Sequence, residues 1–358
     1  MGEEPRRLAV VVKYAAPTTR ISGIVEFLRV LLRRLAERWE VHVVSYDAEG
    51  TGPGPIDLDG YSVHRVRFPF PVTAGRRVAA LQPDATLVVS GINDLRLAVP
   101  YFGILGASLG RATEAAFLQA TNVRSTPSLP FTLVLRRFDP VLCGGPRIHD
   151  DFVSRFGERA VPLPPAVDVD ALAAVCPAPK SQRLRMGFVN HFTTVKGADL
   201  ALEAFATLAA EHDDVEFVAA GTGPLADSLR QRFRSVPRLQ FRGYLHETER
   251  LALMRSCDVM ALPFRTDVSV LGLSQTVLEC LALGVVVVGS DTPAIAPALR
   301  PGVDSLLVEG GDELLAVLRR LHDDPDMLAR MSAAGRARAR DYDVGACARA
   351  LEARLVGP

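Results

Sequence analysis

The residues best suited to bind a phosphorylated ligand lie in a loop of the second half of the chain. The segment FVNHFTTVKG ends in Lys196 and Gly197, directly before an expected helix. A lysine beside a helix N-terminus combines a point charge with free backbone N–H groups, which suits a phosphate. The other lysines among the 41 basic residues are Lys13 and Lys180. This scarcity favours a functional role for Lys196 over a solvated surface lysine.

Two further loops contain glycines that would let the backbone approach a ligand closely. Gly221 and Gly223 lie in AAGTGPLADSL before an expected helix, and Gly243, Tyr244 and Leu245 end an expected strand in FRGYLHETERL. A nucleobase could stack and hydrogen-bond to backbone at the second of these loops. Taken alone, the two glycines of the first loop are a weak signal, and a plain turn with a helix cap is the favoured explanation of the second loop.

Glu279 lies in an apolar helix, VLECLALG, between an expected strand and a glycine-containing loop. One carboxylate can accept hydrogen bonds from both hydroxyls of a ribose. The alternative is a solvated helical glutamate. A carboxylate with apolar residues on both sides requires a partner, however, which favours the first interpretation.

Short apolar strands and amphipathic helices must position these loops. In the first half, LAVVV from Leu8, VHVVSY, DATLVVS and FDPVLCGG are the expected strands, whereas residues 93–135 lack a regular pattern. In the second half, RLRMGFVN, VEFVAAG, LQFRGY, CDVMALPF and VVVVGS alternate with helices. Near-continuous apolar strands indicate parallel sheets that are buried on both faces.

The expected fold class is therefore α/β, with two doubly wound, Rossmann-like domains facing across a cleft. The first domain covers residues 1–170, and a C-terminal helix at about 342–358 is a candidate to pack back on it. A proline-rich linker covers 171–183, and the second domain covers 184–341. Ligands of such domains bind outside the carboxyl ends of the strands.

Composition argues against several classes of protein. The 358 residues carry 41 basic and 41 acidic side chains, and a chain without net basicity is an unsuitable nucleic-acid binder. Five dispersed cysteines without C-x-x-C spacing indicate reduced thiols and no zinc site. No run of eighteen uncharged apolar residues occurs, so we expect no transmembrane segment and a cytoplasmic protein. Peripheral membrane contact is left open.

Several nucleotide-binding and hydrolase motifs are missing. KYAAPTTRISG stands where a dinucleotide site needs G-x-G-x-x-G. Neither the P-loop pattern G-x-x-x-x-G-K-[ST] nor a G-x-S-x-G nucleophile elbow occurs. A dinucleotide-dependent dehydrogenase, a P-loop NTPase and a serine hydrolase of the elbow type are therefore unsupported.

The order of the loops resembles the second domain of retaining glycosyltransferases of the GT-B fold, specifically family 4, the glycosyl transferases group 1. The resemblance covers roughly residues 185–340 and runs through K-G, G-x-G-P, strand-G, CDVMALPF, LECLALGVVVVGSD and GVDSLLVEGGD. The first domain is similar more loosely, through Ser22, Gly23 and Ile24. Each motif is weak alone, but six in this order are specific.

The resemblance implies roles for individual residues. Lys196 would hold the donor diphosphate, Glu279 would bind the ribose, and Gly243 to Leu245 would offer backbone groups to the nucleobase. The other candidates for donor binding are Ser22, Gly23, Asn190, Gly221, Gly223, Leu271, Gly272, Leu273 and Ser274. No cofactor and no metal are expected, because cationic side chains and helix N-termini can stabilise the departing diphosphate.

The chain departs from the family's pattern at three places. Asn190 and His191 stand where the family usually has an arginine. We expect His191 to act as a second catalytic cation with Lys196, and the alternative is a histidine that is packed in the loop. Leu271 stands where a glutamate often contacts the transferred sugar, which would favour a deoxygenated sugar unless Asp267 supplies the carboxylate or Leu271 points into the core. The first-domain histidine of the family has no evident counterpart.

The resemblance therefore implies a retaining hexosyl- or deoxysugar transferase, acting from a nucleotide sugar on a small-molecule or glycan hydroxyl. A UDP-sugar is favoured over a GDP- or dTDP-sugar, and natural-product tailoring, as in antibiotic biosynthesis, is one possible setting. The alternatives are a nucleotide-sugar epimerase or a phosphorylase on the same fold, and a non-catalytic partner subunit that binds nucleotide or lipid. The segments YFGILGASLG and TNVRSTPSLPF do not indicate the acceptor.

Overall fold

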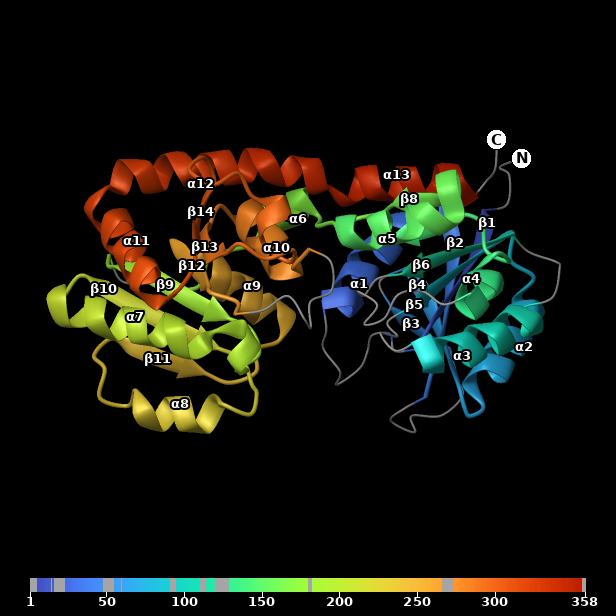
Figure 1. Ribbon diagram of the computed structural model, residues 1–358, viewed down its shortest axis with the longest axis horizontal. Coiled ribbons are helices and arrows are strands. Elements are labelled where there is room, and N and C mark those ends of the chain that lie inside the picture. The colour runs from blue at the N-terminus through green and yellow to red at the C-terminus, as the bar shows by residue number, and fades with distance from the viewer. Residues whose placement is uncertain are drawn as a thin grey trace. The chain divides into compact units, whose positions relative to one another are not determined.

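The computed structural model describes residues 5–13, 15, 23–47, 55–58, 60–90, 95–109, 114–119, 129–179, 182–265 and 273–355. The chain forms two compact units. The first contains residues 1–166 together with 344–358, and the second contains residues 167–343. Each unit is built on one largely parallel sheet covered by helices (Figure 1).

The sheet of the first unit has the strand order β3-β4-β2-β1-β5-β6-β7-β8. β3 is antiparallel to β4, and the other neighbours are parallel. The strands are β1 (Arg6–Val12), β2 (Trp39–Tyr46), β3 (Pro55–Leu58), β4 (Tyr61–Val66), β5 (Ala85–Ser90), β6 (Glu114–Gln119), β7 (Val141–Cys143) and β8 (Ala160–Pro162). The helices are α1 (Gly23–Leu35), α2 (Phe70–Leu81), α3 (Leu95–Ser108), α4 (Leu129–Leu135), α5 (Pro146–Phe156), η1 (Gly157–Arg159) and α13 (Val344–Leu355).

The side chains of β1 point alternately to the two faces of the sheet, and both faces are buried. Leu8 and Val10 belong to a cluster that contains residues of α1 and α13. Ala9 and Val11 point to the opposite face, into a cluster with residues of α2, α3 and α5. All of these strand residues are almost inaccessible to solvent, as the continuous apolar run predicts.

Residues 93–135, expected to be irregular, contain α3, β6 and α4. The expectation failed for α3 because its sequence, LRLAVPYFGILGAS, is apolar along most of its length and shows no polar stripe that would mark a helix. β6 pairs with β5 and β7 and continues the sheet between them.

The sheet of the second unit is parallel, with the strand order β11-β10-β9-β12-β13-β14. The strands are β9 (Leu184–Val189), β10 (Val215–Ala220), β11 (Leu239–Arg242), β12 (Val259–Leu262), β13 (Val286–Ser290) and β14 (Ser305–Val308). The helices are α6 (Val169–Ala173), η2 (Thr194–Lys196), α7 (Ala198–Glu211), α8 (Ala226–Arg232), α9 (Glu247–Arg255), α10 (Gln275–Leu283), η3 (Ala296–Ala298), α11 (Gly311–Asp323), α12 (Pro325–Ala339) and η4 (Arg340–Tyr342).

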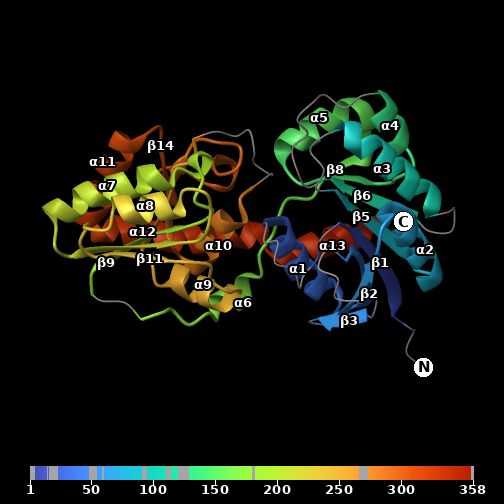
Figure 2. The ribbon, with the colours of Figure 1, turned by 90° about the horizontal axis from the view of Figure 1, so that it is seen from below.

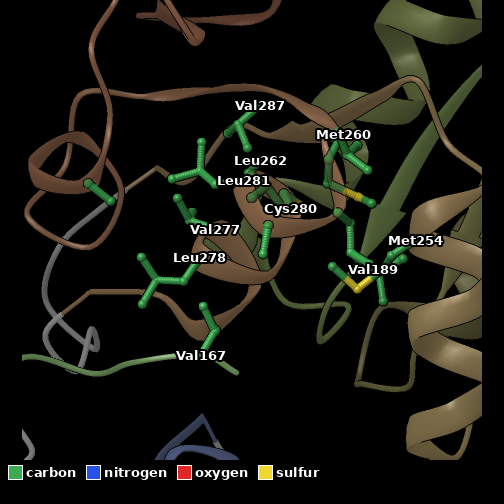
Figure 3. Packing of buried hydrophobic residues seen from close by; sticks show 14 of the residues in the cluster. Val167, Val189, Met254, Met260, Leu262, Val277, Leu278, Cys280, Leu281 and Val287 are labelled. Carbon is green, nitrogen blue, oxygen red and sulfur yellow. The ribbon is translucent and has the colours of Figure 1, made fainter. Parts of the chain in front are cut away.

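Two apolar clusters cover the two faces of this second sheet. One joins strand residues such as Phe188 and Phe217 to α7 and α11. The other surrounds α10, where Leu278 and Leu281 pack with residues of the strands and with Val167, as Figure 3 shows. Figure 2 shows α7 and α11 side by side in the second unit, in agreement with Figure 1.

The boundary between the units differs from the expected linker over 171–183. The chain passes from one unit to the other between Ala166 and Val167. The prolines flank helix α6 rather than interrupt it, and Val169 and Leu172 of that helix are buried in the core of the second unit. Asp168 caps the helix by accepting a hydrogen bond from the N–H of Ala171 at 2.9 Å.

The C-terminal helix α13 belongs to the first unit, although the preceding 177 residues form the second. It packs against α1, and its apolar side enters the first unit's core through Val344, Ala348, Leu351 and Leu355. Among the described residues, no helix combines the length and the apolar composition that crossing a bilayer would require.

Candidate functional site

The strand order of the second sheet reverses direction between β9 and β12. From β9 the chain adds β10 and β11 on one side, and from β12 it adds β13 and β14 on the other. Doubly wound sheets bind ligands outside the carboxyl ends of the strands at this kind of switch point. Lys196 follows β9 and Phe264 follows β12, so both lie in the loops that border it.

The loops at the carboxyl edge are joined to one another in the order of the strands. Backbone N–H groups donate from Gly221 to Gly243 O at 3.0 Å, from Phe192 to Thr222 O at 2.9 Å and from Arg265 to Val195 O at 2.9 Å. The candidate residues of these loops are therefore held on one interconnected edge.

Lys196 is a half-buried cation without an acidic partner in the described chain. Its Nζ lies 3.8 Å from the centroid of the Phe264 ring, and the structure gives it no carboxylate or hydrogen-bond acceptor among the described residues. Burial lowers the pKa of the Lys196 ammonium to about 8. The ring face stabilises the cation only in part, so an anion at the switch point would compensate for lost hydration.

Gly197, at the start of α7, permits the close contact between the loops after β9 and β12. Its φ is 68°, and a Cβ atom would lie 1.9 Å from the carbonyl oxygen of Pro263. Arg265 of the same loop forms a bidentate ion pair with Asp199 in the first turn of α7, at 2.6 and 2.7 Å. Arg265 thus occupies the carboxylate that lies closest in sequence to Lys196.

Asn190 and His191 directly follow β9. The Asn190 Oδ1 accepts a hydrogen bond from the His191 N–H at 2.9 Å, and the His191 Nδ1 donates to the carbonyl oxygen of Thr222 at 3.3 Å. The imidazole is exposed, and its Nε2 has no hydrogen-bond partner in the described chain. The ring is therefore held by one nitrogen and can meet a ligand with the other.

The glycine loop after β10 has little freedom to accept side chains. Gly221 has a φ of 137°, and a Cβ atom there would lie 2.0 Å from the carbonyl oxygen of Asn190. Gly223 similarly lies against the backbone of Phe192. These glycines are needed for contact with the loop after β9, a role that does not require a ligand.

Gly243, Tyr244 and Leu245 follow β11, the outer strand of the sheet. Gly243 has no neighbour within 4 Å of an added Cβ, and Tyr244 is 50% exposed, with its ring edge-on to His246 at 5.2 Å. Leu245 packs against the cluster around α10. The loop thus combines an anchored residue with an exposed aromatic ring.

Glu279 lies in the middle of α10 and is only 5% exposed. The Arg250 guanidinium of α9 donates to both of its oxygens, with Nη1 to Oε2 at 2.5 Å and Nη2 to Oε1 at 2.9 Å. The sequence predicted that this carboxylate needs a partner, and Arg250 is that partner. Because a carboxylate offers about four lone-pair directions, two remain for other donors.

The remaining candidates divide between residues outside the described chain and residues engaged elsewhere. Ser22, Leu271, Gly272 and also Asp267 lie outside the described residues. Gly23 begins α1 in the first unit.

Leu273 is buried in the cluster around α10, and the Ser274 N–H donates to the carbonyl oxygen of Ala294 at 2.7 Å. The Ser274 N–H is therefore engaged within the protein, because the loop after β13 folds back onto the start of α10.

Arg250, Phe264 and Arg265 belong to the site's framework but were not predicted. A weak signal exists for Arg250, which lies one turn before the buried Met254 on the same side of α9. Phe264 and Arg265 directly follow the predicted strand CDVMALPF. Their partners are about 30 to 70 residues away in sequence, so no local pattern identifies the pairs.

Comparison with known proteins shows which sequence family and which relatives the chain is similar to. Residues 183–324 match the sequence family described as glycosyl transferases group 1. A GDP-mannose-dependent monoacylated alpha-(1-6)-phosphatidylinositol monomannoside mannosyltransferase of Corynebacterium glutamicum is 30% identical over 204 residues, 52% of this chain and 53% of that protein. A phosphatidyl-myo-inositol mannosyltransferase of Mycobacterium leprae is 27% identical over 250 residues, 65% of each chain. The chain thus spans between half and two thirds of these curated relatives.

Solved structures extend the likeness over both units at the level of the fold. Anabaena HepE in complex with UDP and glucose has a TM-score of 0.73 at 13% identity, covering 99% of this chain and 100% of that one. A UDP-forming trehalose-phosphate synthase of Burkholderia xenovorans has a TM-score of 0.75 at 14% identity, covering 98% and 100%. The matched segment 183–324 contains the four loops at the carboxyl edge, so this part of the chain is similar to the group 1 glycosyl transferases, and the likeness to the solved structures shows the GT-B fold.

Proposed function

We propose that this protein transfers a glycosyl group from a nucleotide-activated donor to a hydroxyl acceptor and retains the anomeric configuration. The observation that supports this most is Lys196, a half-buried ammonium without an acidic partner among the described residues, at the switch point of a parallel sheet. A diphosphate supplies the negative charge that this position lacks.

The arrangement of the loops provides a route for the reaction. Lys196 and the first-turn N–H groups of α7 hold the diphosphate, and the exposed Nε2 of His191 provides a second contact. The bond between the sugar C1 and the diphosphate oxygen breaks as the acceptor oxygen bonds to C1 from the same face. The acceptor proton passes to the leaving phosphate oxygen, so the step needs no separate base. The cationic groups stabilise the charge that develops on the diphosphate.

Glu279 orients the nucleoside part of the donor in this proposal. Its two free lone-pair directions accept the ribose hydroxyls, while the two hydrogen bonds from Arg250 fix the orientation of the carboxylate. The backbone of Gly243 to Leu245 and the exposed ring of Tyr244 meet the nucleobase.

The nucleobase and the acceptor are the parts on which the relatives differ. The Corynebacterium relative is by its name GDP-mannose-dependent, whereas the HepE crystals contain UDP. The expected preference for UDP therefore stays a prediction, and the sequence likeness to the Corynebacterium relative gives GDP at least equal weight. An Alpha-D-kanosaminyltransferase of Streptomyces kanamyceticus, 25% identical over 150 residues, keeps natural-product tailoring among the settings to test.

The decisive experiment measures binding and turnover with the full chain. Lys196→Ala should weaken binding of GDP and UDP by about 10- to 100-fold, the effect of removing a charge-assisted contact of about 1.5–3 kcal/mol, and leave binding of guanosine and uridine unchanged. Arg330→Ala, which removes an exposed cation of α12, is the matched control. Equal losses for nucleosides and diphosphates would contradict the assignment.

A panel of nucleotide sugars then tests catalysis. Acceptor-dependent release of nucleoside diphosphate, with an α-linked product from an α-linked donor, is the expected result. Binding without release would show a non-catalytic nucleotide-binding subunit. Interconversion of the donor sugar without an acceptor would show an epimerase.

A further inference from the structure

Three potential metal ligands converge at the edge of the second sheet opposite to the donor loops. His212 directly follows the C-terminus of α7, Asp214 directly precedes β10, and His322 lies in the last turn of α11. Helices that follow parallel strands run back across the sheet, so the ends of α7 and α11 lie at its amino edge. Figures 1 and 2 show these two helices side by side.

The ligand atoms lie close to the spacing that one ion requires. One ring nitrogen of each histidine and one oxygen of Asp214 all lie within 4.8 Å of one another, and the His322 Nε2 is 3.0 Å from the Asp214 Oδ1. Two ligands of a tetrahedral ion with bonds of about 2.0–2.1 Å lie roughly 3.3 Å apart. Small rotations of the side chains therefore suffice to place an ion between them.

His322 is oriented as metal-binding histidines are. Its Nδ1 lies 2.8 Å from the Asp323 Oδ1, while its Nε2 faces Asp214. A carboxylate that accepts the second ring N–H fixes the tautomer and the ring plane of a ligating histidine. When an ion binds, it takes the place of any proton on Nε2.

His212 completes the set. Its ring centroid lies 4.0 Å from that of His322, and its ring nitrogens have no hydrogen-bond partner among the described residues. The nearby carboxylates Glu211 and Asp213 are paired with Arg319 and Arg238 respectively, and the cluster itself has no arginine or lysine partner in the described chain. A ring nitrogen of His212 thus lies near the other two ligand atoms without a hydrogen-bond partner among the described residues.

We propose that His212, Asp214 and His322 form a binding site for a divalent transition-metal ion of the Zn²⁺ class, with Asp323 as the carboxylate that orients His322. Two imidazoles and one carboxylate suit Zn²⁺, Co²⁺ or Ni²⁺, whereas Mg²⁺ and Ca²⁺ prefer oxygen ligands alone. Three protein ligands leave a position for water. No metal was expected from the sequence. The three ligands lie in two segments separated by more than a hundred residues, so no local motif marks them.

The ion would connect the end of α7, the start of β10 and the last turn of α11. The site is therefore a clamp within the second unit and is independent of the proposed transfer reaction, which takes place at the other edge of the sheet. Asp214 is 72% exposed in its side chain, which gives an ion access from solvent.

The test is a titration of the full chain with the metal ions alone, after treatment with EDTA. A Cys176→Ser background removes an exposed thiol that would also attract Zn²⁺. We expect one equivalent of Zn²⁺ to bind with heat exchange, one equivalent of Co²⁺ to give visible d–d absorption bands, and Zn²⁺ to raise the unfolding temperature. Mg²⁺ should do none of these.

Variants then locate the ion. His322→Ala and His212→Ala should weaken Zn²⁺ binding by at least about 100-fold, and Asp323→Asn by roughly 10- to 100-fold, the range for carboxylates that orient a ligating histidine. Asp214→Asn tests the site with an exposed, fold-neutral change. His246→Ala, an exposed histidine of the donor edge, is the control and should bind normally. No Zn²⁺ binding in the parent, or unchanged binding in both His322→Ala and Asp214→Asn, would overturn the proposal.

Discussion

Lys196 and Glu279 are charged side chains in apolar surroundings of the same unit, but their environments differ. Glu279 is paired with Arg250 through two hydrogen bonds inside the protein. Lys196 faces the ring of Phe264 and has no acidic partner among the described residues. The fold thus provides an oppositely charged partner for Glu279 and, among the described residues, none for Lys196.

Glu279 is therefore oriented before a ligand binds, whereas Lys196 gains a partner of opposite charge only when an anion binds. A buried charge that is paired within the protein keeps its orientation whether or not a ligand binds. A cation without a partner costs stability until an anion arrives, and that cost becomes binding free energy for the anion. The two positions should therefore respond in opposite ways when their charges are removed.

The largest effect on the free energy of unfolding is expected from breaking the ion pair between Arg250 and Glu279. Arg250→Ala leaves a nearly inaccessible carboxylate without its partner, which should lower the free energy of unfolding by about 3–5 kcal/mol. Urea denaturation measures this loss. The double variant Arg250→Ala with Glu279→Gln should recover part of it, because no buried charge is left unpaired. An equal loss in both variants would show that Arg250 acts through packing alone.

Lys196→Met removes the charge of the half-buried lysine and should raise stability, whereas Arg250→Ala should lower it. The thioether keeps contact with Phe264 and removes a half-buried charge, so the free energy of unfolding should rise by about 1 kcal/mol. Nucleoside diphosphate affinity should fall by about 1.5–3 kcal/mol in the same protein. Calorimetric titration and thermal unfolding give the two values. A protein that loses both stability and affinity would place Lys196 among the structural residues.

The pH dependence of the same lysine sharpens the contrast. Burial lowers the Lys196 pKa from an ordinary 10.5 to about 8 in the folded chain. Between pH 8 and 10.5 the unfolded chain binds more protons at Lys196 than the folded chain does. The contribution of Lys196 to the free energy of unfolding therefore rises with pH from about 8 to 10.5.

Diphosphate affinity should change in the other direction. It should fall above about pH 8 as the ammonium deprotonates, by at most about 1.4 kcal/mol per pH unit. Titrations from pH 7 to 9.5 measure the slope, and Lys196→Met should remove this step. A wild-type affinity that stays constant over the range would contradict the assignment.

His191→Arg is expected to have the smallest effect. A guanidinium at position 191 adds a cation to the loop that ends in Lys196, and its fixed fork should tighten diphosphate binding by about 1 kcal/mol or less. Weaker binding by the variant would show that the contact between the Nδ1 and Thr222 O matters more than charge.

The residues of the carboxyl edge show what the sequence could predict. Short apolar strands with loops between them placed Lys196, Gly221, Gly243 and Glu279 after or beside the correct strands, because strand position follows from local patterns. The need of Glu279 for a partner also followed from its apolar flanks.

The identity of partners could not be predicted in the same way. Arg250 meets Glu279, and Arg265 meets Asp199, across 29 and 66 residues, and only the packing of helices and loops brings each pair together. The hydrogen bond from the Ser274 N–H could not be predicted for the same reason, because its acceptor, the carbonyl oxygen of Ala294, lies twenty residues further along the chain. In the first unit, α3 was missed because a uniformly apolar helix lacks the periodicity by which sequences reveal helices.

The return of α13 to the first unit has a consequence for the order in which the protein can be made. The second unit is one continuous segment, so all of its core residues exist as soon as Asp343 has been synthesised. The first unit needs Ala348, Leu351 and Leu355 beside α1, and these follow the whole second unit in the chain. During translation the half that begins first is therefore completed last, and until then it exposes an apolar face of α1 to the surroundings of the ribosome.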